Sequence, residues 1–202
     1  MRALYVTHPQ VAIDPLVPVP LWGLSLKGRA RAEAFYRRGV VPAEAMVFTS
    51  AERKAVEMAD IFTAERDGLV TADHDMGEND RSATGFLPPD LFEATADRFF
   101  AQPEQSVDGW ERAIDAQARI VKAVAIALVT VPPGRPAVFC GHGAVGTLLK
   151  CFVGKRGIAR SEDQSRGGNP GGGNCFVFDL RGEVLHSDWI EMEALEQGWE
   201  RE

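Results

Sequence analysis

The sequence has 202 residues, of which 45% are hydrophobic and 25% are charged, and its net charge at neutral pH is −7. This length and composition predict a single globular domain over 1–202 and exclude a chain that is disordered throughout. The negative charge argues against nucleic acid or an acidic membrane as a partner, yet it permits a local group of arginines for a small anion. No apolar run reaches the length of about 18 residues that a membrane-spanning helix needs.

Three cysteines, Cys140, Cys151 and Cys175, show neither a CxxC pair nor the spacing of a zinc site. Their odd number gives no disulfide framework and favours a reducing compartment. The first residues, MRALYVTH, lack the long apolar stretch of a signal peptide. We therefore expect a cytoplasmic protein in which Cys140 is a small core residue; a nucleophilic Cys140 is the less favoured alternative, because buried cysteine is usually inert.

The first third of the chain predicts strands that alternate with helices. Short apolar runs predict strands at 3–6, 46–49 and 69–71. Three prolines make 11–22 an extended loop. Helices are expected over 26–38, between an N-cap at Ser25 and a stop at Gly39, and over 51–65, with Ser50 as N-cap.

The rest of the chain continues this alternation after a polar loop. Helices are expected at 89–101, at 109–131 after an N-cap at Asp108, and at 144–153; strands are expected at 137–140, 175–180 and 183–187. The last two strands form a hairpin, which could offer an edge to a homodimer. The tail from Asp188 is expected to be partly helical. The block 72–106 is interpreted as a helical insertion over one end of the sheet.

This order predicts a three-layer α/β/α sandwich with a largely parallel sheet, whose ligand lies at the carboxyl ends of the strands. Thr7-His8, Thr49-Ser50 and Gly141-His142 each follow a predicted strand, so they should meet at one edge. A neutral imidazole is a good nucleophile, and an arginine such as Arg53 grips phosphate oxygens. These residues indicate phosphate chemistry.

Four motifs in order resemble the histidine phosphatase (phosphoglycerate mutase-like) superfamily. Its Arg-His-Gly motif corresponds to Thr7-His8-Pro9, and its Leu-x-x-x-Gly-x-x-x-Ala helix to residues 24–32. Its Ser-x-x-x-Arg-Ala motif corresponds to the stretch from Ser50, and its Ser-His-Gly motif to Gly141-His142-Gly143. The resemblance covers nearly the whole chain and implies the fold predicted above.

The resemblance also implies roles. His8 would attack phosphorus and become phosphohistidine, while Arg53, His142 and Gly143 would hold the phosphate. A family carboxylate acts as acid and then as base, and Glu78 is the first candidate for it, with Asp80 second. No metal and no cofactor are implied, and the expected partner is a small phosphorylated substrate or inorganic phosphate.

Two departures from the family affect the first motif. Thr7 stands where the family has an arginine, and this removes a cation worth roughly 1.5–3 kcal/mol from a phosphate pocket. Pro9 replaces a glycine and removes a backbone N–H. Arg81, three residues after Glu78, is our candidate to replace the missing cation. Thr7 itself is kept as a candidate substrate-binding residue.

Several alternatives stay open at this stage. The most favoured function is hydrolysis of a small phosphomonoester; a phosphoglycerate mutase-type phosphotransferase and a weakened phosphate- or sugar-phosphate-binding protein of the same fold are the others. The glycines of residues 141–146 also match the G-x-G-x-x-G fingerprint of a dinucleotide-binding oxidoreductase, with Glu162 and Asp163 about twenty residues later. The glycines of 167–173 predict a mobile loop, with an anion-binding nest or a lid as the alternatives. Asp14, His74 and His186 are weaker site candidates.

Overall fold

A seven-stranded sheet forms the centre of the computed structural model, which describes residues 1–64 and 70–201. The strands in chain order are β1 (Ala3–Thr7), β2 (Met46–Ser50), β3 (Val70–Asp73), β4 (Ala137–Gly141), β5 (Asn174–Asp179), β6 (Val184–Leu185) and β7 (Ile190–Glu191). They are arranged β3-β2-β4-β1-β5-β6, and β7 pairs with β5. The first four strands are mutually parallel, whereas β5 runs antiparallel to β1.

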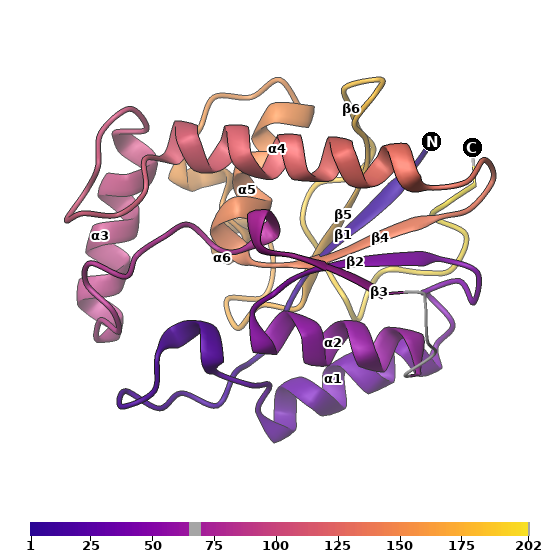
Figure 1. Cartoon of the computed structure of the whole chain (residues 1–202), viewed down its shortest axis with the longest axis horizontal. Helices are drawn as coiled ribbons and strands as arrows, with labels where there is room; N and C mark the ends of the chain where they lie inside the picture. Colours follow the sequence, from indigo (N-terminus) through magenta and orange to yellow (C-terminus); the bar gives the residue numbers. More distant parts are fainter. Residues whose placement is uncertain (65–69, 202) are drawn as a thin grey trace.

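Helices cover both faces of this sheet, as Figure 1 shows. Helices α1 (Leu26–Arg37) and α2 (Arg53–Thr63) lie on one face, and α4 (Ala113–Thr130) and α5 (Gly143–Val153) lie on the other. The predicted three-layer α/β/α sandwich is therefore confirmed. The remaining elements are α3 (Pro89–Ala101), the short α6 (Gln164–Gly167) and three 3₁₀ turns, η1 (Val19–Leu21), η2 (His74–Met76) and η3 (Arg160–Glu162).

The core has two halves because successive side chains of a strand point to opposite faces of the sheet. Along β1, Ala3 and Tyr5 pack on the side of α4 and α5, whereas Leu4 and Val6 pack on the side of α1 and α2. All five residues of β1 are buried. A strand that is buried on both faces reads as a continuous apolar run, which is why its sequence predicts it well.

Two predicted helix starts are wrong. Ser50 ends β2 instead of capping a helix, and α2 begins only at Arg53. Asp108 does not cap α4, which begins at Ala113; Asp108 and Gly109 take positive φ angles of 51° and 81°, so the chain turns before the helix can start. By contrast, the Ser25 side chain caps α1 as predicted, by accepting from the Gly28 N–H. The predicted helix end at Glu65 and strand start at Leu69 lie outside the described residues.

The C-terminal part also differs from the prediction. The tail after Asp188 contributes the short strand β7 and then turns, up to residue 201, and no helix. The second strand of the hairpin is only Val184–Leu185. The segment 167–173 packs against the backbone of His8: Gly173 donates to the His8 carbonyl at 3.1 Å, and Gly172, at φ 74°, has no room for a side chain because a Cβ would lie 2.3 Å from that oxygen. Residues 170–172 of this segment line a cavity together with His8.

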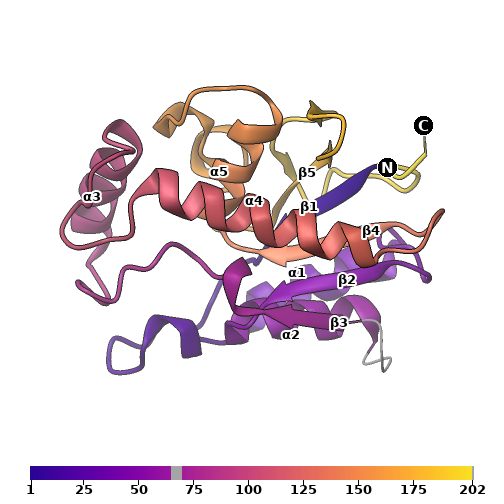
Figure 2. The same cartoon turned by 45° about the horizontal axis from the view of Figure 1, so that its top comes forward.

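The chain between β3 and α4 leaves the layered body and forms one end of the molecule. Figure 2 shows α3 standing at this end, across the end of α4. Residues of this stretch line a cavity together with His8, as described below. Within the described residues, no helix is both long and apolar enough to cross a bilayer.

Candidate active site

His8 is the first residue after β1, and backbone hydrogen bonds hold it from two sides. Its N–H donates to the Gly141 carbonyl at 2.9 Å, and its own carbonyl accepts from Gly173. The ring nitrogen Nδ1 lies 2.9 Å from the Pro9 carbonyl, which can only accept. The proton of the neutral ring therefore sits on Nδ1, and the lone pair of Nε2 is left available. Burial lowers the pKa of His8 to about 4, so the imidazole is neutral and nucleophilic at pH 7.

His142 faces His8 at the end of β4. The two ring centres are 5.2 Å apart and the rings stand at 71° to each other. His142 is fully buried, and burial lowers its pKa well below the ordinary value, against the opposing charge of Glu52. Its Nε2 lies 2.6 Å from Ser50 Oγ, whereas the buried Nδ1 has no hydrogen-bond partner among the described residues. An unpaired polar atom at this depth is a position for a ligand atom.

Lys54 and Glu52, at the start of α2, lie next to His142 on this side of the site. Lys54 is buried, and its ammonium donates to the Val19 carbonyl at 2.9 Å and pairs with Glu52. Glu52 Oε1 also accepts from the Glu78 N–H at 2.8 Å and lies 3.4 Å from His142 Nε2. Burial alone would raise the pKa of Glu52, but His142 and Lys54 outweigh it and hold the pKa at about 2. Glu52 is thus an anion that offsets the lysine charge.

Arg53 does not reach this site, contrary to the prediction that it binds phosphate. Its side chain is 64% exposed and pairs with Glu57 one turn along α2 at 2.8 Å. Successive residues of a helix are turned by about 100°, so only one of two neighbours can face the sheet edge. The structure turns Lys54 inward. The sequence does carry a signal for this: counted from Ser50, the pattern Ser-x-x-x-basic-Ala reaches Lys54 and Ala55.

Glu78 lies against the start of α5. Its carboxylate accepts from the backbone N–H groups of Ala144 at 3.2 Å and Val145 at 3.0 Å. Burial raises the pKa of Glu78, although Arg81 and the amides of α5 oppose this rise. Asp80, the second candidate for the acid, is exposed, and hydrogen bonds from Ser82 lower its pKa. Glu78 therefore holds a proton at higher pH than Asp80 does.

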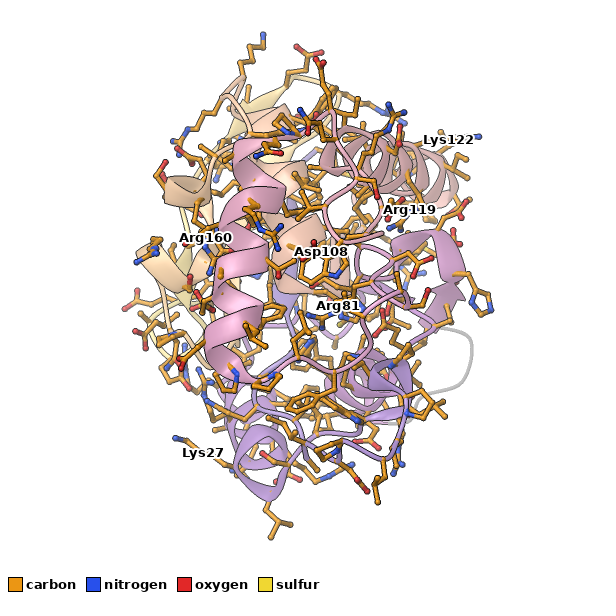
Figure 3. The ribbon with its side chains drawn as sticks, turned by 90° about the vertical axis from the view of Figure 1, so that its left-hand side faces the viewer. Lys27, Arg81, Asp108, Arg119, Lys122 and Arg160 are labelled. Carbon is orange, nitrogen blue, oxygen red and sulfur yellow. The ribbon has the colours of Figure 1, made fainter. Side chains whose placement is uncertain are left out.

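Arg81 lies between two cavities. One, of about 380 Å³, is lined by His8, Gln164 and apolar side chains that include Trp22 and Phe86. The other, of about 720 Å³, is lined by Glu52, Glu78 and the 18–21 loop among others. Arg81 lines both, its guanidinium lies 5.0 Å from the centre of the Phe92 ring, and no described carboxylate pairs with it. Figure 3 shows Arg81 beside α3, near the middle of this face.

Thr7 is buried, its hydroxyl bonds to protein groups, and it does not line the cavity that contains His8. Its hydroxyl accepts from the Asn174 N–H at 2.9 Å and donates to Gln164 Oε1 at 2.8 Å. Gly143, the first residue of α5, lies next to the same glutamine: a Cβ at Gly143 would stand 2.2 Å from Gln164 Nε2. Sequence reasoning missed Gln164, because its place depends on the docking of residues that are far apart along the chain.

The weaker candidates lie away from the two histidines. Asp14, His74 and His186 are all exposed. Of the three, only His74 lines a described cavity, the larger one, on which Asp80 also lies. Cys140 is buried in β4, and its burial raises the pKa of the thiol, which disfavours a thiolate nucleophile. None of these four residues lines the cavity that contains His8.

The dinucleotide-binding alternative lacks its second strand. Glycines 141–146 do join β4 to α5, but α5 is followed by η3 and α6. Glu162 lies in η3, and the next strand, β5, is antiparallel to β1. The fingerprint requires a parallel strand that ends at the acidic residue.

The anion-binding nest considered for residues 167–173 has its amides occupied at two positions. The N–H groups of Gly171 and Gly172 both donate to Asn169.

We compared the sequence and the structure with those of known proteins. No family model matches the sequence, and no curated protein sequence matches it. Solved structures do match: YhfR from Bacillus stearothermophilus has a TM-score of 0.74 at 18% identity, over 95% of this chain and 98% of that chain. The chain has the histidine phosphatase fold. The resemblance predicted from the four motifs is thus confirmed for the fold.

Two further proteins with this fold give the same result. A mycobacterial glucosyl-3-phosphoglycerate phosphatase, solved with inorganic phosphate, has a TM-score of 0.72 at 21% identity, over 96% of this chain and 99% of that chain. The same phosphatase has also been solved with VO3. A protein from Thermus thermophilus has a TM-score of 0.61 at 18% identity, over 94% of this chain and 99% of that chain. At these identities the likeness establishes the fold, and the chemistry has to be argued from the site.

The pKa of His8 leads to an expectation for the acid limb of any reaction at this site. Because burial lowers this pKa to about 4, Nε2 stays unprotonated until the pH falls through that value. We expect kcat/KM for a phosphate ester to be retained at pH 5.5 and to fall about tenfold per pH unit below about pH 4. Steady-state rates over pH 3.5–8, with stability followed by circular dichroism, check this. A limb centred near pH 6.5 would contradict it.

Proposed function

We propose that this protein is a metal-independent phosphomonoester hydrolase that forms a phosphohistidine on His8. The observation that carries the proposal is the neutral His8 ring, with its proton held on Nδ1, packed against His142 at the edge of the sheet. Two cations, Lys54 and Arg81, and the half-buried acid Glu78 surround this pair. The phosphate complex of the mycobacterial neighbour supports an anion of this type in the same fold.

In the first half of the reaction, His8 Nε2 would form a bond to phosphorus while the bond from phosphorus to the leaving oxygen breaks. Glu78 would give its proton to that oxygen, so that an alcohol departs. In the second half, a water oxygen attacks phosphorus, Glu78 takes the water proton, and His8 is released with inorganic phosphate. Arg81 and Lys54 would stabilise the charge on the phosphoryl oxygens, and His142 would donate to them in the tautomer whose proton is on Nδ1.

The two cavities suggest which way the substrate lies. The acid must touch the leaving oxygen, and Glu78 lines the 720 Å³ cavity, whereas His8 lines the 380 Å³ cavity. The phosphoryl group would then sit beside Arg81, which lines both, with the alcohol in the larger cavity. This volume is in the range of ordinary small-molecule sites.

The direct test is hydrolysis of para-nitrophenyl phosphate by the native protein with and without EDTA. Turnover that resists the chelator, with release of inorganic phosphate, is the expected result. Absence of turnover from pH 4 to pH 8, together with no binding of orthophosphate, would contradict the proposal.

Arg81 supplies a second prediction, because it is our replacement for the cation that Thr7 lacks. Arg81→Ala should lower kcat/KM by about 10- to 150-fold, which corresponds to the loss of about 1.5–3 kcal/mol from a charge-assisted contact. Steady-state kinetics measure this, and Arg37→Ala, which changes an exposed arginine on α1, is the matched control. An Arg81→Ala protein with native affinity and rate would refute the replacement.

A phosphate-binding protein without turnover is the second candidate. It is favoured by Glu52, which pairs with Lys54 inside the site and lowers the positive charge that phosphoryl transfer requires. Tight binding of orthophosphate by a protein that hydrolyses neither aryl nor alkyl phosphates would support this candidate over the hydrolase.

A further inference from the structure

Gln164 is part of the wall of the His8 cavity, yet one end of its side chain has no partner. Oε1 accepts from Thr7 Oγ1 and from Asn174 Nδ2, both at 2.8 Å. No described residue accepts a hydrogen bond from Nε2. This side chain comes from α6, a part of the chain that the four motifs do not include.

The orientation of the Gln164 amide follows from backbone donors, whose direction is unambiguous. The Asn169 N–H donates to Asn174 Oδ1 at 2.7 Å, so the other end of that amide, Nδ2, is the donor that faces Gln164. The Asn174 N–H donates to Thr7 Oγ1, and the Thr7 hydroxyl proton has two acceptors, Gln164 Oε1 at 2.8 Å and the Asn174 carbonyl at 3.3 Å, of which the glutamine is the closer. Two donors thus converge on Oε1, and Nε2 must point away from them.

The position of Nε2 is known relative to the start of α5. It lies beside Gly143, the residue after His142, at a position where an added Cβ would come within 2.2 Å. Gln164 and His8 line the same cavity. The amide therefore presents two N–H donors next to the two histidines, and its support comes from the threonine that stands in the place of the family arginine.

We propose that Gln164 is a phosphoryl-binding residue and that Thr7 and Asn174 are the positioning residues that aim it. This neutral amide, held by hydrogen-bonded neighbours, would add N–H donors to the phosphoryl site that Arg81 also lines. This inference rests on the proposed function, and it explains why a buried threonine is compatible with an anion site.

The test combines affinity and turnover in four variants. Gln164→Leu should raise Kd for orthophosphate about tenfold, the loss expected for one hydrogen bond to a charged ligand, and Gln164→Glu should raise it about 100-fold because a carboxylate would face the phosphate. Thr7→Val should behave like Gln164→Leu, whereas Thr7→Ser should restore native affinity. The exposed Gln105→Glu is the control for added negative charge. Isothermal calorimetry with orthophosphate and kcat/KM with para-nitrophenyl phosphate are the readouts, and circular dichroism shows that each variant is folded.

Each outcome bears on one of the two proposals. Native affinity in both Gln164 variants would overturn the inference while leaving the hydrolase intact. Equal loss in Thr7→Val and Thr7→Ser would overturn the positioning role of the hydroxyl. A native protein that neither binds orthophosphate nor hydrolyses the aryl ester would contradict the proposed function itself, and the inference would fall with it.

Discussion

His8→Ala should abolish turnover of para-nitrophenyl phosphate, with kcat/KM reduced by roughly 10³-fold or more, as expected when a covalent nucleophile is removed. The reason is that His8 Nε2 is left free: the Nδ1 proton is held by the Pro9 carbonyl, and burial keeps the alternative nucleophile, the Cys140 thiol, protonated. Initial rates in EDTA measure the effect. The variant should still bind orthophosphate, because Arg81 and Lys54 remain.

The control for His8→Ala is His186→Ala, which removes an exposed imidazole from the hairpin end. It should keep native kinetics. If His8→Ala retains more than a few per cent of native activity while folded, the phosphohistidine mechanism is refuted and a directly attacking water has to be considered.

Glu78→Gln should lower the rate of hydrolysis by an amount that depends on the basicity of the leaving group. An alkyl alkoxide needs a proton to depart, so kcat for an alkyl phosphate should fall by about 10²- to 10⁴-fold. A nitrophenolate leaves without a proton, so the rate for para-nitrophenyl phosphate should fall far less. In the native protein, the alkyl ester rate should decline as the pH rises through the raised pKa of Glu78, because the acid then loses its proton. Glu78→Gln should remove this decline.

Asp80→Asn is the matched variant for Glu78→Gln. Asp80 is exposed and ionised to a lower pH than usual, so it is a poor acid at neutral pH. Its substitution should leave the ratio of alkyl to aryl rates unchanged. A change of that ratio in Asp80→Asn, and none in Glu78→Gln, would exchange the roles of the two carboxylates.

The sequence predicts the fold where local patterns decide it. The apolar runs of β1 and β4 and the Ser25 cap depend on residues within a few positions of each other, and their predictions are confirmed. The predicted start of α4 is wrong because the positive φ at Asp108 belongs to a turn that packs against α3 through Arg98. A pattern of neighbouring residues in the sequence cannot predict a contact between a turn and a separate helix.

The site shows the same division. His8 and His142 follow from motifs at strand ends, Glu78 is the first candidate for the carboxylate that the family resemblance implies, and the structure brings the three to one place. The prediction of Arg53 in place of its neighbour Lys54 is wrong. One position along a helix turns the side-chain direction by about 100°, so Lys54 is buried at the site while Arg53 is exposed. Gln164 could not be predicted, because its aim depends on the antiparallel pairing of β5 with β1, more than 160 residues away.

That pairing has a consequence for the order in which the site can assemble. His8 precedes by more than 160 residues both Asn174, which supports Gln164, and Gly173, which holds the His8 carbonyl, so these two are synthesised after β1 to β4. A chain that has formed β1 to β4 would carry the nucleophile without its neighbouring donor. An anion that binds only the finished site would then favour the docked state of the C-terminal strand over the open one, by mass action. Binding of the anion and docking of β5 onto β1 would therefore be thermodynamically coupled, so that each process favours the other.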